Sequence, residues 1–210
     1  MNSHLEMPVV LSGAPLEEAS GAALLIHGRN QEPKDMLTLV EQLKFPSINY
    51  VIPTAKEKSW YTNKFMEDPA LNEPGLSNAL EVIDRHLESF ELNNLPLEQQ
   101  ILIGFSQGAC LVSEYLCRYK RRPKYVFILT GGYQGSNKIY KMGCTLKGTE
   151  IYISNGDKDP WVPLNRTIET TELFANNGAN VNLKVFPERP HEISIHEVND
   201  MRRILNDSFS

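Results

Sequence analysis

A serine lies between two glycines where a strand-like run turns into a helical pattern. The apolar run of residues 100–105 leads through Gly-Phe-Ser-Gln-Gly, residues 104–108, into a segment with apolar residues at helical spacing. Glycines on both sides of such a turn allow the strand and the helix to approach each other closely. The serine between them projects its hydroxyl above the sheet, so Ser106 is a candidate nucleophile. The five-residue motif also occurs by chance, and its position between a strand and a helix favours function.

Short apolar runs of strand length alternate with longer segments of helical period. This order is typical of a parallel sheet covered by helices on both faces, and therefore of an α/β fold. The expected strands are residues 8–11, 22–27, 49–52, 100–105, 125–129, 150–154 and 181–186. The expected helices are residues 34–43, 76–90, 109–119, 164–176 and a last one after residue 191. No linker interrupts the pattern, so residues 1–210 are expected to form a single domain.

One long stretch, residues 53–74, follows neither a helical nor a strand pattern. Its aromatic residues Trp60, Tyr61 and Phe65 lie among Lys, Asn, Asp and Pro residues. A loop of this length in a compact domain is usually functional. We therefore consider it a candidate cap over a pocket.

Charge and cysteine content exclude several classes of partner and site. The net charge is -5, and no basic stripe or polybasic segment suggests nucleic acid or a membrane as partner, so a small molecule is expected. Cys110, Cys117 and Cys144 are too few and too irregularly spaced for a disulfide framework or a zinc site, and no metal is expected. Their odd number fits a reducing compartment. Residues 1–7 do not resemble a signal peptide, so the protein is expected to be cytoplasmic.

A serine hydroxyl becomes a nucleophile when an imidazole takes its proton and an acid orients the imidazole. The turn resembles that of the α/β-hydrolases, and this resemblance implies partners that follow in the order serine, acid, histidine. Two histidines, His191 and His196, follow Ser106. His191 comes directly after the expected last strand, where a loop would bring it to the same edge of the sheet, whereas His196 lies in the helical region. His191 is therefore the candidate base.

The candidate acids are Asp157 and Asp159, the two aspartates between Ser106 and His191. Both follow the expected strand at residues 150–154. The local sequence suggests a turn in which Asp157 bonds backbone amides, leaving Asp159 to reach the histidine. We favour Asp159.

Acyl transfer also requires donors for the negative charge that develops on the carbonyl oxygen. The amide after the nucleophile belongs to Gln107, and a second amide is expected from the loop after an early strand. Here that loop begins His27-Gly28-Arg29, and we assign the N–H of Arg29. His27 is expected to have a structural role.

The sequence leaves the nature of the substrate pocket open. Five aromatic residues either line a pocket or pack the long loop onto the sheet: Trp60, Tyr61, Phe65, Tyr133 and Trp161. An aromatic pocket under a short cap would suit small or medium acyl groups. The Arg29 side chain either binds a substrate carboxylate or is solvated.

The chain resembles the phospholipase/carboxylesterase branch of the α/β-hydrolases, which includes acyl-protein thioesterases and small bacterial carboxylesterases. The resemblance covers nearly the whole length and rests on several motifs taken together. These are His27-Gly28-Arg29, Ser59-Trp60-Tyr61, residues 72–76, residues 104–109, Gly131-Gly132, residues 156–163 and His191-Glu192-Ile193. Two positions depart from the family: Glu188-Arg189-Pro190 replaces a Gly-Met-Gly that is common before the histidine, and Trp161 replaces a smaller residue.

The resemblance implies Ser106, Asp159 and His191 as a catalytic triad, with a mostly parallel sheet and a short cap loop. It also implies hydrolysis of carboxylic esters or thioesters without a metal or other cofactor. Two alternatives remain: a lactone hydrolase similar to the dienelactone hydrolases, and a non-catalytic binding protein with a hydrolase fold. The dienelactone hydrolases carry a cysteine at the strand-to-helix turn where this chain has Ser106. A monomer or a homodimer is expected.

Overall fold

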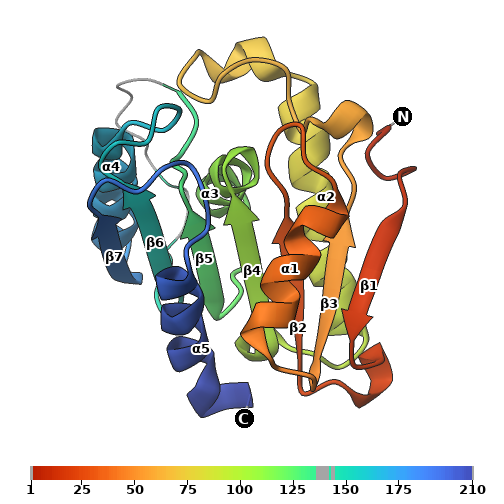
Figure 1. Cartoon of the computed structure of the whole chain (residues 1–210). Helices are drawn as coiled ribbons and strands as arrows, with labels where there is room; N and C mark the ends of the chain where they lie inside the picture. The colour runs from red at the N-terminus through yellow and green to blue at the C-terminus, as the bar shows by residue number, and fades with distance from the viewer. Residues whose placement is uncertain (1, 136–141, 143–144, 210) are drawn as a thin grey trace.

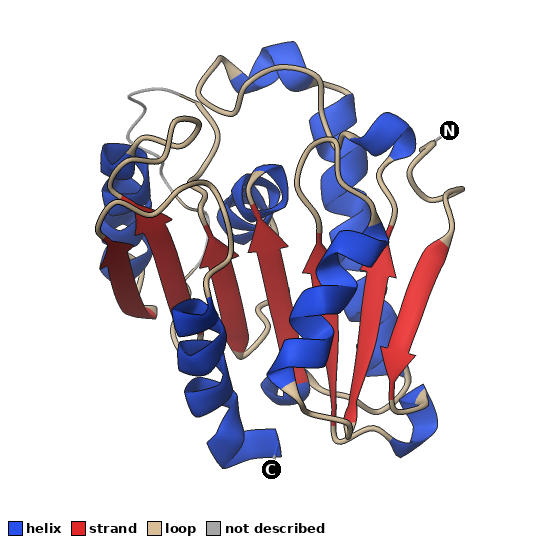
Figure 2. Cartoon of the chain, viewed as in Figure 1, coloured by secondary structure: helices blue, strands red, loops and turns tan. Residues whose placement is uncertain are grey.

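The computed structural model describes residues 2–135, 142 and 145–209. Within these residues, seven strands form one sheet in the order β1-β3-β2-β4-β5-β6-β7 (Figures 1 and 2). The strands are β1 (Val9–Gly13), β2 (Gly21–Ile26), β3 (Ile48–Pro53), β4 (Gln100–Phe105), β5 (Tyr125–Leu129), β6 (Glu150–Gly156) and β7 (Asn180–Phe186). The edge strand β1 pairs antiparallel with β3, and all other pairs are parallel.

Helices cover both faces of the sheet. They are α1 (Pro33–Leu43), α2 (Gly75–Leu92), α3 (Gln107–Arg118), α4 (Leu164–Asn176) and α5 (Ile195–Phe209). Helices α1 and α5 pack on one face, and α2, α3 and α4 pack on the other (Figure 1). The sheet therefore divides the apolar interior into two layers, each of which lies between the sheet and the helices on that face.

The interior strand β2 has an apolar sequence without alternation, and its position between two core layers explains this pattern. Ala22, Leu24 and Ile26 face the core layer beneath α2 and α3, whereas Ala23 and Leu25 face the layer beneath α1 and α5. All five side chains are fully buried. A strand in a parallel sheet with helices on both faces must be apolar on both sides, which produces a continuous run.

The expected α/β fold with a mostly parallel sheet is confirmed, and the expected strands and helices agree with the observed ones to within a few residues. The expectation that residues 53–74 contain neither helix nor strand was wrong in part. This stretch contains two short 3₁₀ helices, Lys56–Lys58 and Pro69–Asn72. Their few residues carry too little periodicity to be recognised in a sequence. Cys144 lies outside the described residues.

The topology brings four connections to the same edge of the sheet. Because the parallel strands all run in one direction, the residues after β2, β4, β6 and β7 emerge side by side (Figure 2). These connections contain residues 27–32, 106, 157–163 and 187–194, and they include every candidate catalytic residue. No helix in the part of the chain that the structure describes is both long and apolar enough to cross a membrane.

Candidate active site

Ser106 occupies a strained turn between β4 and α3. Its backbone has φ 54° and ψ −118°, a conformation that costs a residue with a side chain on the order of 1–3 kcal/mol. Hydrogen bonds hold the residue on both sides: its N–H donates to the carbonyl of Leu129 at 3.1 Å, and its carbonyl accepts from the N–H of Cys110 at 3.0 Å. The surrounding sheet and helix thus impose the strain that raises the hydroxyl above the strand end.

The two glycines of the turn are required by close packing. A Cβ atom at Gly108 would lie 2.1 Å from the carbonyl oxygen of Ile26, at the end of β2. A Cβ atom at Gly104 would lie 2.5 Å from the carbonyl oxygen of Gly108. Neither distance is possible, so any larger residue would displace the start of α3 from β2 or β4.

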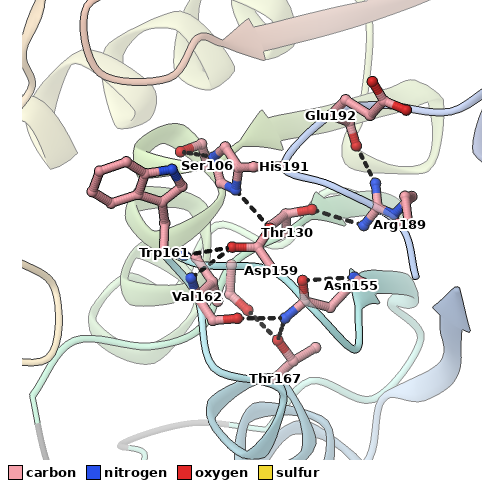
Figure 3. A network of polar contacts seen from close by, with 12 residues as sticks. Ser106, Thr130, Asn155, Asp159, Trp161, Val162, Thr167, Arg189, His191 and Glu192 are labelled. Carbon is pink, nitrogen blue, oxygen red and sulfur yellow. Dashed lines mark hydrogen bonds and ion pairs between the residues drawn. The ribbon is translucent and has the colours of Figure 1, made fainter. Parts of the chain in front are cut away.

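The structure brings Ser106, His191 and Asp159 together. His191 Nε2 lies 2.8 Å from Ser106 Oγ, and His191 Nδ1 lies 2.7 Å from Asp159 Oδ2 (Figure 3). The neutral tautomer that satisfies both contacts donates from Nδ1 to the carboxylate and accepts the serine hydroxyl at Nε2. The carboxylate is fully buried, whereas 18% of the His191 side chain is exposed. This geometry fits a serine, a base and an orienting acid.

In the loop after β6, the two candidate acids have different hydrogen-bond partners. Asp159 Oδ1 accepts the backbone N–H groups of Trp161 and Val162, each at 2.8 Å, and Oδ2 remains for His191. Asp157 Oδ1 instead accepts the N–H of Glu188 at 2.7 Å, which joins this loop to the one after β7. Asp159 is therefore the aspartate that orients the imidazole, and Asp157 ties the two loops together.

Arg189 holds the histidine loop through a buried ion pair that the sequence did not reveal. Its guanidinium donates to Glu197 Oε2 at 2.8 Å and to Thr130 Oγ1 at 3.0 Å, and it also bonds the carbonyl of Glu192. Glu197 is fully buried and also accepts the hydroxyl of Ser154 at 2.5 Å. The sequence marked Arg189 as part of a departure from the family, but its acidic partner lies in the next helix, where no motif identifies it.

The two backbone segments expected to supply oxyanion donors both adjoin Ser106. Gln107 begins α3, where N–H groups have no partner within the helix. In the loop after β2, a Cβ atom at Gly28 would lie 3.2 Å from Ser106 Cβ, so this loop contacts the nucleophile. Its other amides donate to partners as follows: Gly28 to Gln31 Oε1, Asn30 to the Lys58 carbonyl and Gln31 to the Gly28 carbonyl. The N–H of Arg29 has no partner among the described residues.

The side chain of Arg29 is exposed, and its guanidinium bonds the backbone of a neighbouring loop. Its guanidinium donates to the carbonyls of Tyr61, Thr62 and Asn63 at 2.6–2.8 Å. The guanidinium is therefore engaged with the loop that follows β3 and is not free for a substrate carboxylate, while the residue stays exposed to solvent.

His27 and His4 enclose the indole of Trp60, which is fully buried. The ring centroids lie 5.0 Å and 5.5 Å from that of Trp60, respectively. His27 Nε2 accepts the N–H of Ala55 at 3.1 Å, and His27 Nδ1 donates to the Gly28 carbonyl at 2.7 Å. Burial lowers the pKa of both His27 and His4 below the ordinary value of 6.5. His27 thus has the structural role expected of it, as a neutral residue.

The five aromatic candidates for the pocket occupy two kinds of environment. Four are buried in the core layer beneath α2 and α3: Trp60, Tyr61, Phe65 and Tyr133. Trp161 is 66% exposed, and Figure 3 shows it beside Ser106 and His191. Of the five, Trp161 is the one whose ring is available to a ligand in this structure. Two hollows of about 470 and 540 Å³ lie elsewhere, near β7 and β1, and Ser106 lines neither.

Cys110 is unsuited to act as the nucleophile in place of Ser106. It lies one helical turn further along α3 and is buried against Tyr61 and Gly132. Burial raises the pKa of its thiol to about 12, so the reactive thiolate does not form near neutral pH. Among the described residues, no group of three or more His, Cys, Asp or Glu side chains could hold a metal ion.

The chain is similar in sequence and fold to several known proteins. A profile described as Phospholipase/Carboxylesterase matches residues 6–208. The chain is 33% identical to a phospholipase/carboxylesterase from Dyadobacter fermentans, whose crystal structure superposes with a TM-score of 0.87 over 97% of this chain and 96% of that one. It is 24% identical to acyl-protein thioesterase 1 of Saccharomyces cerevisiae over 94% of this chain and 96% of the relative. The carboxylesterase of Bacillus cereus shares the fold at 19% identity, with a TM-score of 0.77 over 99% and 97% of the two chains.

The contact between Gly108 and β2 can be tested by substitution. Gly108→Ala should reduce the free energy of unfolding by about 1–3 kcal/mol, because the added methyl forces α3 away from Ile26. The measurement is urea denaturation followed by circular dichroism. Gly75→Ala is the control, since a Cβ atom there meets nothing closer than 3.7 Å. Equal stability of the two variants would contradict the packing argument.

The buried histidines predict a loss of stability in mild acid. Because the folded-state pKa values of His4 and His27 lie below 6.5, the unfolded chain binds more protons as the pH falls through that value. Their stabilisation is complete above pH 6.5 and decreases below it. The Tm should therefore fall between pH 7.5 and pH 5, and the fall should be smaller in the double variant His4→Gln/His27→Gln. An unchanged wild-type Tm would contradict this prediction.

Proposed function

The chain belongs to the phospholipase/carboxylesterase family of α/β-hydrolases, and from this premise we propose that it is a serine esterase with Ser106, His191 and Asp159 as its catalytic triad. The single observation that supports this most strongly is the continuous hydrogen-bonded chain from Asp159 through His191 to Ser106, at 2.7 and 2.8 Å. Residues 1–210 act as one catalytic domain in this proposal, because every strand among the described residues belongs to the same sheet.

In the first half-reaction, Ser106 Oγ attacks the carbonyl carbon of the ester. His191 Nε2 accepts the hydroxyl proton as the new C–O bond forms, which leaves the imidazole positively charged. Asp159 remains ionised and stabilises that charge through His191 Nδ1. The tetrahedral intermediate then collapses: the bond to the leaving alcohol or thiol breaks, and His191 returns the proton to it. An acyl group on Ser106 remains.

In the second half-reaction, His191 removes a proton from water, and the resulting nucleophile attacks the acyl-enzyme. Collapse of this second intermediate releases the carboxylic acid and returns the proton to Ser106 Oγ. Asp159 maintains one tautomer of His191 throughout. Its own position is maintained by the backbone amides of Trp161 and Val162.

The developing oxyanion is bound by the N–H groups of Arg29 and Gln107. Gln107 is the first residue of α3 and follows Ser106 directly, and Arg29 follows Gly28, which lies against Ser106 in the loop after β2. The N-terminal end of a helix also carries partial positive charge, which favours an anion there. Preorganised donors of this kind each lower the barrier by about 3–4 kcal/mol in serine hydrolases.

We propose small or medium acyl esters as substrates. The buried aromatic side chains of Tyr61, Phe65 and Tyr133 fill space in the core rather than line a channel for a long chain. The exposed indole of Trp161 provides an apolar surface beside the triad for either side of the ester. The proposal includes thioesters, in which the leaving group is a thiol instead of an alcohol, in keeping with the thioesterase relatives. The cytoplasmic location, the absence of a cofactor and the oligomeric state stay predictions.

The test is hydrolysis of p-nitrophenyl esters with acyl chains of two to twelve carbons, beside an acyl-CoA thioester and a lactone. The wild type should have its highest kcat/KM on the shorter p-nitrophenyl esters. Ser106→Ala should lower kcat by at least about 10³-fold and keep the wild-type fold by circular dichroism.

Retention of activity in Ser106→Ala would contradict the assignment of the nucleophile. A wild type that hydrolyses the lactone in preference to every open-chain ester would contradict the substrate class and favour the lactonase alternative. His196→Gln is a matched control, because His196 is exposed on α5 and has no place in the mechanism.

A further inference from the structure

We propose that the side chains of Arg29 and Gln107 position the oxyanion-binding amides by holding one shared backbone segment, residues 59–63, here named the brace. The inference rests on the proposed function, since it concerns the same two amides. It adds to that function a positioning role for two side chains that do not contact the reacting atoms.

Gln107 holds the brace with both ends of its carboxamide. Its Nε2 donates to the carbonyl of Tyr61 at 2.8 Å, and its Oε1 accepts the N–H of Trp60 at 3.0 Å. The Ser59 hydroxyl lies 3.2 Å from the same Nε2. Only 6% of the residue is exposed. A two-point contact of this kind determines the orientation of the side chain, and through it the orientation of the first turn of α3.

Arg29 holds the brace from the other side of the site. Its guanidinium donates to three successive carbonyls, those of Tyr61, Thr62 and Asn63, at 2.8, 2.6 and 2.8 Å. The planar fork of donors matches a curved run of carbonyls in a way that a lysine could not. The loop after β2 is thereby joined to the brace directly at the residue whose N–H is the second proposed oxyanion donor.

The carbonyl of Tyr61 is the point that both side chains share. It accepts from Arg29 and from Gln107, and also from the hydroxyl of Ser59 at 2.8 Å. The two amides lie in different connections, one after β2 and one after β4, and these connections also meet where Gly28 lies against Ser106. A common acceptor therefore makes the position of one amide depend on the position of the other.

Contacts at both ends hold the brace in place, so it can position the two amides. The Trp60 indole is fully buried between two histidines and donates to the carbonyl of His27 at 2.9 Å. At the other end, the N–H of Asn63 donates to Asn72 Oδ1, and Asn63 Nδ2 donates to the Leu71 carbonyl, both at 2.7 Å. Movement of the brace would break several buried contacts together.

The experiment compares wild type with Arg29→Met, Gln107→Met and the double variant, all of which retain the backbone N–H groups. We expect each single variant to lower kcat for p-nitrophenyl acetate by about 10-fold, less than the 10²–10³-fold loss of a whole oxyanion donor, with little change in KM. A trifluoromethyl ketone, which forms a tetrahedral adduct, should bind more weakly by a similar factor. The hydrolysis product should bind equally well. Arg29→Lys should restore less than half of the lost activity.

The shared carbonyl of Tyr61 also predicts how the effects of the two substitutions combine. The loss in the double variant should be clearly smaller than the product of the two single losses, because either substitution already releases the brace. Arg85→Met is the matched control, since Arg85 is exposed on α2 and pairs with Glu81. It should behave as wild type. All variants are to be assayed well below their measured Tm, so that unfolding does not contribute.

Three outcomes decide the inference. Wild-type kcat in both folded single variants would overturn it, and so would single losses that multiply in the double variant. Weaker binding of the product and of the ketone by equal factors would indicate a general structural role and would also overturn it. Failure of the proposed function is a separate result, recognised by a Ser106→Ala variant as active as wild type. The rate of Ser106 labelling by a fluorophosphonate gives the same comparison without any ester substrate.

Discussion

The strained turn at Ser106 is the constraint on which the site depends. A residue with φ 54° and ψ −118° persists only where its surroundings hold it, and here β2, β4 and the first turn of α3 do so by direct contact. The helix can approach the sheet this closely because Gly104 and Gly108 carry no side chain. The hydroxyl is consequently raised above the end of β4, at the sheet edge where the loops after β2, β6 and β7 also emerge.

Each of those loops contributes one function and is stabilised by contacts of its own. The loop after β6 positions Asp159 with two backbone amides, and the loop after β7 carries His191 and is held by the buried pair of Arg189 and Glu197. A buried ion pair of this kind adds little net stability compared with an apolar pair, but breaking it is costly, so it strongly favours one loop conformation. The loop after β2 brings Gly28 against Ser106. Rigid strands with short, well-bonded loops thus hold the reacting groups within hydrogen-bond distance before any substrate binds.

Most of the fold, and the meeting of Ser106, His191 and Asp159, could be predicted from the sequence because they depend on local patterns. Continuous apolar runs such as that of β2 identify strands buried on both faces, and the order of Ser106, Asp159 and His191 follows from loops at one sheet edge. What could not be predicted depends on long-range partners. Arg29 gave no sign that it would bond carbonyls more than thirty residues away, and nothing marked Glu197 as the partner of Arg189. The sequence likewise did not show that Trp60 is buried in the core and Trp161 exposed. The burial of an aromatic side chain in a loop depends on the elements that pack against it.

The central claim is that an acyl group is transferred to Ser106. It is tested most directly by mixing the protein with a p-nitrophenyl ester, quenching with acid during turnover, and locating the acyl group by peptide mass spectrometry. The account predicts an added acyl mass on the peptide that contains Ser106, absent from the Ser106→Ala variant. An acyl group found on Cys110, or turnover without any covalent adduct in a reaction quenched before deacylation, would contradict it.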